Sequence, residues 1–228
     1  MRFAIQREVL LKPLQQVINV VDRRNTLPVL ANVLVSVDAN GLSVTSSDTE
    51  VEMVARSPVD ADAQAGETTI PARKLFDIIR ALPDGSLVKC SLSGERISLN
   101  AGRSRFTLST LPAREFPSTE SLEIVEKVTL PEGTLRELIE RTSFAMAQQD
   151  VRFYLNGLLF DLRENMLRCV ATDGHRLALC EAELATGAKT RRQLILPRKG
   201  VLELQRLLEG GDRTIELEVG RSHLRVRR

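Results

Sequence analysis

The organisation of this chain is visible in one stretch, Cys169-Val170-Ala171-Thr172-Asp173-Gly174-His175-Arg176-Leu177-Ala178. It has the pattern of a strand, a tight polar turn at Asp173-Gly174 and a second strand that we expect to begin with His175 and Arg176. A weaker copy, Val44 to Met53, stands 125 residues earlier, with Asp48 in the place of Asp173. Only the later copy carries a His-Arg pair.

The offset of 125 residues also relates other parts of the chain. One constant offset over separated blocks predicts an internal repeat, which is the signature of duplicated modules. The related blocks are Leu30–Val35 with Leu155–Phe160, Arg73-Lys74 with Arg198-Lys199, and Gly85 with Gly210.

The repeat predicts a first module over residues 1-120 and a second module over residues 121-228. The boundary follows from Leu111 to Glu120, a stretch with two prolines and no regular apolar period, as expected of a linker. Most of Gly102 to Leu111 of the first module would map beyond Arg228. We therefore expect the second module to be incomplete at its C-terminus, and the chain to be a fragment.

Apolar spacing predicts two helices and several strands in each module. One face of the first helix is formed by Leu10, Leu14, Val17, Ile18 and Val21. A second helix begins after Pro71 and ends at Pro83-Asp84-Gly85. The second module repeats this order, with helices around 135–139 and over 198–208. Strands are expected at 3–5, 33–37, 42–44, 51–55, 87–92, 97–99, 106–108, 128–130, 158–162, 167–171, 176–180, 193–196, 215–219 and 223–226. Helices packed on mostly hairpin-linked strands predict an α+β fold, tandemly duplicated.

The composition is that of a folded protein, with 43% hydrophobic and 27% charged residues among 228. No apolar run approaches the roughly 18 residues that span a bilayer, and Met1 to Arg7 lacks the apolar core of a signal peptide. We expect a cytoplasmic protein with no membrane partner. The three cysteines form no close pair, so reduced core thiols are expected instead of a disulfide or metal framework.

An enzyme would have to use Asp173 and His175, because the other histidine, His223, lies in a terminal strand. Acyl-transfer chemistry also needs an activated nucleophile, and no Gly-x-Ser-x-Gly elbow is present. One histidine beside one aspartate offers too few ligands for a catalytic zinc, and no glycine loop for a nucleotide phosphate is present. We therefore expect no catalytic residue, metal or cofactor, and expect Asp173 to cap its turn.

The charge is distributed unevenly, although the net charge is only +2. The four predicted helices carry a total of +5, which leaves −3 for the rest of the chain. Solvated charges on helix faces are common, but here a basic pair recurs at the start of the second helix in each module. Such cations would contact phosphates and would not read bases. An aromatic content of 4% argues against a stacking platform for single strands.

Several segments together resemble the bacterial sliding clamp family, the β subunit of DNA polymerase III. The resemblance covers the whole chain, and it rests on the following segments: Leu10-Leu11-Lys12-Pro13-Leu14, Thr69-Ile70-Pro71-Ala72-Arg73-Lys74, 102–112, Asp150-Val151-Arg152-Phe153-Tyr154-Leu155-Asn156-Gly157, Ala171-Thr172-Asp173-Gly174-His175-Arg176-Leu177 and Leu196-Pro197-Arg198-Lys199-Gly200.

The resemblance implies the DNA clamp fold and no catalytic activity. Family members have three such modules per chain, and two chains join head to tail into a ring of six modules around duplex DNA. In this chain the third module is absent and the second is unfinished, so we expect a fragment that cannot close the ring.

The resemblance also implies three groups of functional residues. The DNA contacts are Arg24, Gln149, Tyr154 and Lys199, to which Arg73 and Arg198 are added from their position. The wall of a peptide-binding groove is formed by Leu155, Thr172, Gly174, His175, Arg176 and Leu177. The first-module half of the dimer interface consists of Lys74, Ile78, Arg96, Arg103, Arg105 and Phe106.

The expected function is that of a DNA polymerase processivity factor. Its expected partners are duplex DNA without sequence preference, the polymerase III catalytic subunit, the clamp loader, other polymerases and repair proteins with clamp-binding peptides, and a second copy of the full-length chain. The competing interpretation is a two-module peptide-binding adaptor that never encircles DNA.

Overall fold

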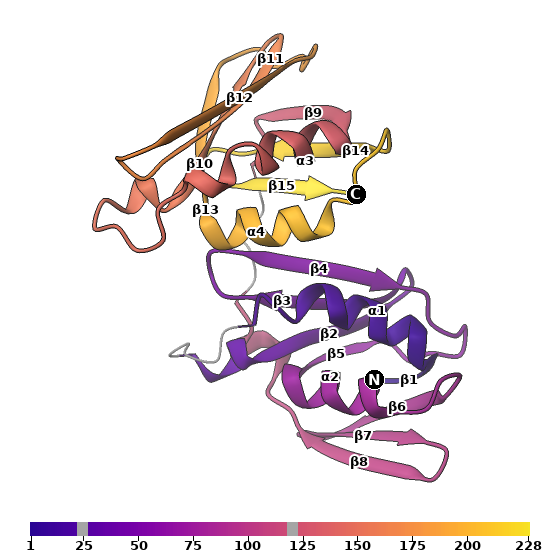
Figure 1. The fold of residues 1–228 in the computed structure, drawn as a ribbon. Helices are drawn as coiled ribbons and strands as arrows, with labels where there is room; N and C mark the ends of the chain where they lie inside the picture. Colours follow the sequence, from indigo (N-terminus) through magenta and orange to yellow (C-terminus); the bar gives the residue numbers. More distant parts are fainter. Residues whose placement is uncertain (22–26, 118–122) are drawn as a thin grey trace. The chain divides into compact units, whose positions relative to one another are not determined.

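The structure is a computed structural model that describes residues 1–21, 27–117 and 123–228. The chain divides into two compact units, Met1–Thr119 and Glu120–Arg228. Within the described residues, each unit contains two α-helices and two antiparallel sheets (Figure 1). The α+β architecture predicted for the repeated module is confirmed.

The first unit is built from two four-stranded sheets, in the orders β1-β6-β7-β8 and β4-β3-β2-β5. Helices α1 and α2 lie against each other, and α1 also contacts β4. Its elements are β1 (Arg2–Gln6), α1 (Arg7–Val17), η1 (Pro28–Ala31), β2 (Asn32–Asp38), β3 (Gly41–Ser47), β4 (Glu52–Ser57), β5 (Gly66–Pro71), α2 (Ala72–Ala81), β6 (Leu87–Ser93), β7 (Arg96–Ala101), β8 (Ser104–Ser109) and η2 (Ala113–Glu115).

The second unit repeats this plan, with a four-stranded sheet in the order β12-β11-β10-β13 and a three-stranded sheet in the order β15-β14-β9. Its elements are β9 (Glu126–Pro131), α3 (Glu132–Glu140), η3 (Ser143–Ala145), η4 (Phe153–Leu155), β10 (Gly157–Arg163), β11 (Met166–Thr172), β12 (Leu177–Glu183), β13 (Arg192–Pro197), α4 (Arg198–Leu207), β14 (Thr214–Val219) and β15 (Leu224–Arg227).

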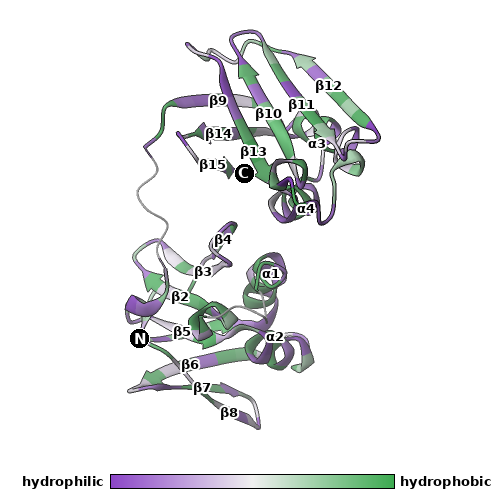
Figure 2. Ribbon diagram, turned by 90° about the vertical axis from the view of Figure 1, so that its left-hand side faces the viewer, coloured by the Kyte–Doolittle hydropathy of each residue, from purple (hydrophilic) through white to green (hydrophobic). Residues whose placement is uncertain are grey.

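The cores follow from the two side-chain periods. Leu75 and Ile79 on α2 are buried four residues apart, and burial alternates residue by residue along β4 and β11. Hydrophobic residues, green in Figure 2, accordingly follow the sheet strands and the helices. Burying a side chain such as Leu75 contributes roughly 1.5–3 kcal/mol. None of the helices in the described parts of the chain has the length and apolar character that crossing a membrane requires.

Several elements differ from the sequence prediction. Strand β5 was not predicted, because Gly66 and Pro71 at its ends suggest turns; pairing with β2 makes it a strand. Helix α1 ends at Val17, so Val21 lies outside it. The expected strand start at His175 and Arg176 is wrong, because both residues lie in the turn and β12 begins at Leu177.

The constant offset of 125 is also wrong beyond β12. It holds where Leu34 pairs with Thr45 and Leu159 with Val170. The offset becomes 126 at β13, because Asn32 pairs with Pro71 in the first unit and its equivalent Gly157 pairs with Pro197 in the second. It becomes 127 at β14, because Gln6 pairs with Leu87 and its equivalent Pro131 pairs with Thr214.

The cause of the drift is one additional residue in each of two surface connections, where insertions are readily tolerated. As a consequence, Arg73 corresponds to Lys199 in the second unit, and Ala72 corresponds to Arg198. The proposed superposition of Arg73-Lys74 on Arg198-Lys199 is therefore corrected by one position.

The cysteines are free thiols. Burial raises the pKa of Cys90 to about 12, and burial together with the neighbouring Cys180 raises that of Cys169 to about 12. Cys169 and Cys180 lie opposite each other on β11 and β12. The prediction that no two cysteines form a close pair is therefore wrong for the folded chain. Strand pairing brings together residues that eleven positions separate in the sequence.

Candidate functional site

The turn between β11 and β12 is closed by its own polar side chains. Asp173 Oδ1 accepts hydrogen bonds from the backbone N–H of His175 and of Arg176, both at 3.0 Å. The Thr172 hydroxyl accepts from the N–H of Gly174 at 3.1 Å and donates to the carbonyl of Arg176 at 2.7 Å. Gly174 has φ +88°, a backbone conformation that glycine adopts without strain. The expected capping role of Asp173 is confirmed.

Beyond the turn backbone, the side chains form an exposed surface that is both cationic and apolar. The guanidinium of Arg176 lies 2.9 Å from Asp173 Oδ2, which holds it at the turn. Its Cζ also lies 5.7 Å from the ring centroid of Phe144, a cation–π contact. Leu177 is 65% exposed and Phe144 is 59% exposed. Exposed apolar side chains mark a place where a partner can bind when they form one continuous patch.

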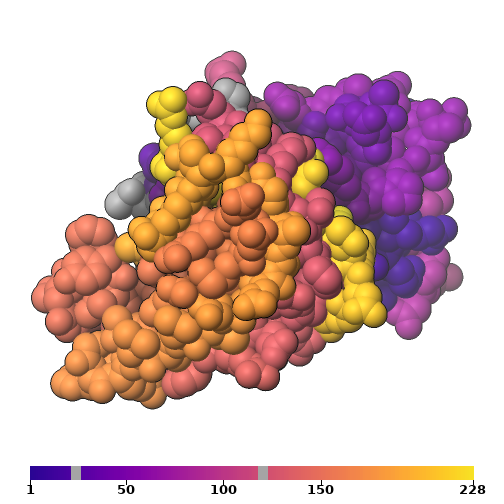
Figure 3. All heavy atoms as spheres, turned by 90° about the horizontal axis from the view of Figure 1, so that it is seen from above, coloured from indigo at the N-terminus to yellow at the C-terminus, as the bar shows by residue number. Residues whose placement is uncertain are grey.

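A loop over residues 146–156 lies beside this turn and is held by hydrogen bonds of the Asn156 side chain and of the backbone. The Asn156 side chain accepts from the N–H of Asp150 at 2.8 Å and donates to the Asp150 carbonyl at 2.9 Å. The N–H of Ala147 donates to the carbonyl of Leu155 at 3.0 Å. Figure 3 shows this loop as a separate lobe at the edge of the second unit.

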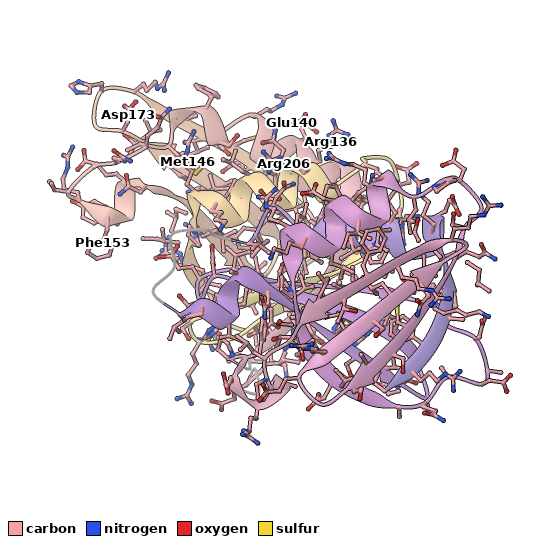
Figure 4. All side chains as sticks on the ribbon, turned by 90° about the horizontal axis from the view of Figure 1, so that it is seen from below. Arg136, Glu140, Met146, Phe153, Asp173 and Arg206 are labelled. Atoms are coloured by element: carbon pink, nitrogen blue, oxygen red, sulfur yellow. The ribbon has the colours of Figure 1, made fainter. Side chains whose placement is uncertain are left out.

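At the tip of the loop two aromatic side chains are exposed. Phe153 is 81% exposed and Tyr154 is 51% exposed, and their rings meet edge to face with centroids 6.0 Å apart. Figure 4 places Phe153 and Asp173 at one end of the second unit, with Met146 closer to its centre. Gln149 is exposed on the same loop. The predicted DNA contacts Gln149 and Tyr154 thus lie on one protruding segment.

Arg198 holds the loop over residues 146–156 through two hydrogen bonds to its backbone. Its backbone N–H donates to the carbonyl of Asn156 at 3.1 Å, and its Nη1 donates to the carbonyl of Met146 at 3.2 Å. Arg198 is half-buried, as is Lys199. These bonds give Arg198 a structural role in positioning the loop, in addition to the DNA contact that its sequence position suggested.

Leu155, predicted in the peptide groove, is only 8% exposed. Thr172, Gly174, His175, Arg176 and Leu177 are together at the turn, so the structure gathers five of the six groove residues on one element.

The remaining predicted residues lie in the first unit. Arg24 lies outside the described residues. Arg73 is half-buried on α2, and its Nε is buried without a hydrogen-bond partner. The six predicted interface residues fall on two elements: Lys74 and Ile78 on α2, and Arg96, Arg103, Arg105 and Phe106 on the β7–β8 hairpin.

The hairpin has the geometry of an open sheet edge. Strand β8 ends its sheet, and Arg105, Phe106 and Thr107 along it are all exposed. An edge strand presents unpaired backbone groups that another strand can bind.

Phe144 and Arg152 lie at the site although they were not among the predicted residues. The guanidinium of Arg152 lies over Gly174, so close that a Cβ on that residue would be 3.1 Å from Arg152 Nη2. Arg152 also makes three hydrogen bonds to Asp150, from its N–H at 2.8 Å, Nε at 3.0 Å and Nη2 at 2.9 Å. These bonds, above all those from the side chain, lower the pKa of Asp150 to about 2. No sequence pattern marks a contact between a loop and a turn twenty-two residues away.

Both α+β units match models of one protein family. Residues 1–120 match the DNA polymerase III beta subunit, N-terminal domain, and residues 129–228 match its central domain. The chain therefore belongs to the DNA polymerase III beta subunit family.

Relatives and solved structures agree with this membership. The beta sliding clamp of Pseudomonas putida is 52% identical over 226 residues, which cover 99% of this chain and 62% of the relative. The crystal structure of the DNA polymerase III subunit beta from Pseudomonas aeruginosa has a TM-score of 0.95 at 50% identity, covering 100% of this chain and 62% of that chain. A sliding clamp from the same species bound to griselimycin has a TM-score of 0.94 at 51% identity, with the same coverage.

The chain spans about 62% of the length of the curated relatives it matches. Their name does not favour the competing interpretation of a peptide-binding adaptor that never encircles DNA.

Proposed function

We propose that this chain contributes the first two modules of a processivity factor, a ring-forming sliding clamp that encircles duplex DNA and docks replication and repair proteins. The observation that carries the proposal is the match of both units, in order, to the N-terminal and central domains of the polymerase III beta subunit. The factor acts without catalysis and in the cytoplasm, where a bacterial chromosome is replicated.

In this proposal, DNA is held by several weak contacts to phosphates. The contact residues are Arg24, Arg73, Gln149, Tyr154, Arg198 and Lys199. Phosphate contacts carry no sequence information and exchange readily, so they permit sliding. Arg198 has the additional role of holding the loop that carries Gln149 and Tyr154, through its bonds to Met146 and Asn156.

The second surface binds short peptides from the polymerase III catalytic subunit, the clamp loader, other polymerases and repair proteins. Its residues are Leu155, Thr172, Gly174, His175, Arg176 and Leu177. An apolar peptide side chain would pack on Leu177, while exposed backbone groups at Gly174 would orient the peptide. The griselimycin-bound clamp of Pseudomonas aeruginosa supports ligand binding in the family.

In the whole protein, two chains pair head to tail through Lys74, Ile78, Arg96, Arg103, Arg105 and Phe106. The open edge at β8 supports this proposal, since strand addition would extend the sheet across the interface. A chain that lacks the partner surface would not close the ring.

The test is retention of the whole protein on DNA after loading by a clamp loader. A ring held by topology stays on nicked circular DNA and runs off after the circle is linearised, while a protein held by phosphate contacts alone stays equally on both. Equal retention would exclude encirclement. Raising the salt concentration serves as the control, because it weakens phosphate contacts without opening a ring.

A further inference from the structure

Arg152 joins the two surfaces of the second unit. It lies between Gln149 and Tyr154 in the sequence, and its guanidinium lies against Gly174 in space. The loop proposed to contact DNA and the turn proposed to contact peptides therefore meet at one side chain. A second contact, between Arg176 and Phe144, joins the turn to η3, which lies outside the loop.

The position of Arg152 is fixed from both sides. Its two side-chain hydrogen bonds to Asp150, from Nε and Nη2, hold the guanidinium in one plane. A third bond, from its backbone N–H, and the two bonds of Asn156 fix the backbone beside Asp150. On the other side, the distances from an added Cβ at Gly174 to Arg152 Nη2, Nη1 and Cζ are 3.1, 3.6 and 3.7 Å. A flat group fits there because glycine has no side chain. A displacement of the loop moves Arg152 and alters the surroundings of Gly174.

We propose that Arg152 is a positioning residue that couples the two surfaces, so that a ligand held by the loop changes the affinity of the turn for a peptide. The two states are the arrangement described here, with Arg152 on Gly174, and an arrangement with Arg152 released. A ligand that orders the loop favours the first state, and the second ligand then binds a turn that is already ordered.

The inference rests on the proposed function, because it takes DNA and peptide as the two ligands. Coupling between two binding sites is reciprocal, so DNA must tighten peptide binding by the same factor by which peptide tightens DNA binding. For one half-exposed guanidinium contact we expect a factor of about five, the lower end of typical coupling. Arg152 is 51% exposed, which leaves room for its release.

The experiment follows the backbone amides of Gly174 and Tyr154 by NMR in the 228-residue chain. The probes are a short DNA duplex and a synthetic peptide copied from the clamp-contacting segment of a bacterial replicative polymerase. In the unsubstituted chain, DNA should shift both amides, the peptide should shift both, and saturating DNA should lower the peptide Kd about fivefold.

Three variants separate the causes. In Arg152→Ala each ligand should shift only the amide of its own element, and DNA should leave the peptide Kd unchanged. Arg152→Lys keeps the charge but loses the flat, forked group, and should behave like the alanine variant. Arg221→Ala removes an arginine that is 77% exposed and paired with Glu123 at 3.4 Å, and should behave like the unsubstituted chain.

The outcomes are distinguishable. If DNA fails to shift Tyr154 and the peptide fails to shift Gly174 in the unsubstituted chain, neither element is the proposed contact surface, and the coupling is wrong with it. If each ligand shifts its own amide alone, the function stands and the coupling is wrong. Coupling that persists in Arg152→Ala, or that Arg152→Lys preserves, would show that the guanidinium contact is not its cause.

Discussion

The two units contain the same turn in the same place, and only one of the turns is expected to bind a partner. In both, an aspartate accepts two backbone N–H groups and a hydroxyl accepts a third. In the first turn, Asp48 accepts from the N–H of Glu50 at 3.0 Å and of Val51 at 2.8 Å, and Ser47 accepts from the N–H of Thr49 at 3.2 Å. In the second turn, Asp173 accepts from the N–H of His175 and of Arg176, both at 3.0 Å, and Thr172 accepts from the N–H of Gly174 at 3.1 Å. These bonds are the architecture of the module.

The turns differ in the side chains that the shared backbone presents. The left-handed position is Thr49 at φ +81° in the first turn and Gly174 at φ +88° in the second. Two residues after this left-handed position, the first turn has Val51 and the second has Arg176. Because Gly174 has no Cβ, it leaves space for the guanidinium of Arg152. Comparison of the copies thus separates what closes the turn from what the second turn offers to a ligand.

The largest effect is expected when the second turn is given the side chains of the first. The double substitution His175→Glu and Arg176→Val keeps the two backbone bonds to Asp173, because those bonds use only N–H groups. It removes the cation over Phe144 and adds a negative charge. Peptide affinity should fall at least about tenfold, or about 1.4 kcal/mol, in isothermal titration calorimetry.

The matched control is the reverse exchange in the first unit, Glu50→His with Val51→Arg. It should leave the fold intact and create no peptide site, because Arg152 and Phe144 are in the other unit. Full peptide affinity in the double variant of the second turn would remove His175 and Arg176 from the groove.

A smaller effect is expected when the glycine of the second turn is replaced by the threonine of the first. In Gly174→Thr the side chain must adopt φ +88°, and its Cβ would meet Arg152 Nη2 at 3.1 Å. The free energy of unfolding should fall by about 1–2 kcal/mol from the left-handed backbone, with a further loss from the close contact to Arg152. Urea unfolding followed by circular dichroism measures this loss. In the double variant with Arg152→Ala the penalty should be smaller, and an unchanged penalty would assign all of it to the backbone.

Acid should affect the second unit through a buried carboxylate. Glu218 on β14 is 3% exposed and is surrounded by Lys127 at 2.9 Å and by Arg225 and Arg227, each at 3.2 Å. The hydrogen bond from Lys127, followed by that from Arg227, lowers the pKa of Glu218 to about 2. Since the folded pKa lies below the ordinary value near 4.5, the stabilisation is present above about pH 4.5 and is lost as the pH falls toward 2.

Hydrogen exchange resolved by mass spectrometry should therefore show β9, β14 and β15 losing protection between pH 4.5 and pH 2. Glu218→Gln cannot titrate, so it should lower protection at neutral pH and flatten its dependence on acid. The first unit provides an internal reference that this substitution does not alter. A pH profile that Glu218→Gln leaves unchanged would contradict the assignment to Glu218.

Much of the architecture could be predicted because its signals are local. The apolar spacing around Leu75 and Leu135 places two of the helices, and Pro71, Pro131 and Pro197 stand immediately before α2, α3 and α4. The repeat placed β2 and β3 on β10 and β11 correctly.

What could not be predicted depends on contacts across the fold. Strand β5 owes its existence to pairing with β2, and the register after β12 shifts because insertions in connections leave no periodic mark. The half-buried state of Arg198 and the position of Arg152 over Gly174 follow from loop geometry, which the sequence does not encode by spacing. Residue type therefore indicated the turn, while only the structure shows which side chains lie against it.

The smallest effect concerns Thr49, the left-handed residue of the turn without an assigned ligand. Thr49→Gly relieves a conformation that costs an L-residue about 1–2 kcal/mol, but glycine also makes the unfolded chain more flexible, which costs about 0.5–1 kcal/mol. The two terms oppose each other, so we expect stabilisation of about 0.5 kcal/mol in urea unfolding. Thr49→Ala, which keeps the strained φ, is the control and should not stabilise. Marked destabilisation by Thr49→Gly would mean that the threonine side chain contributes to the first turn, so that the two turns differ in architecture as well as in the surface they present.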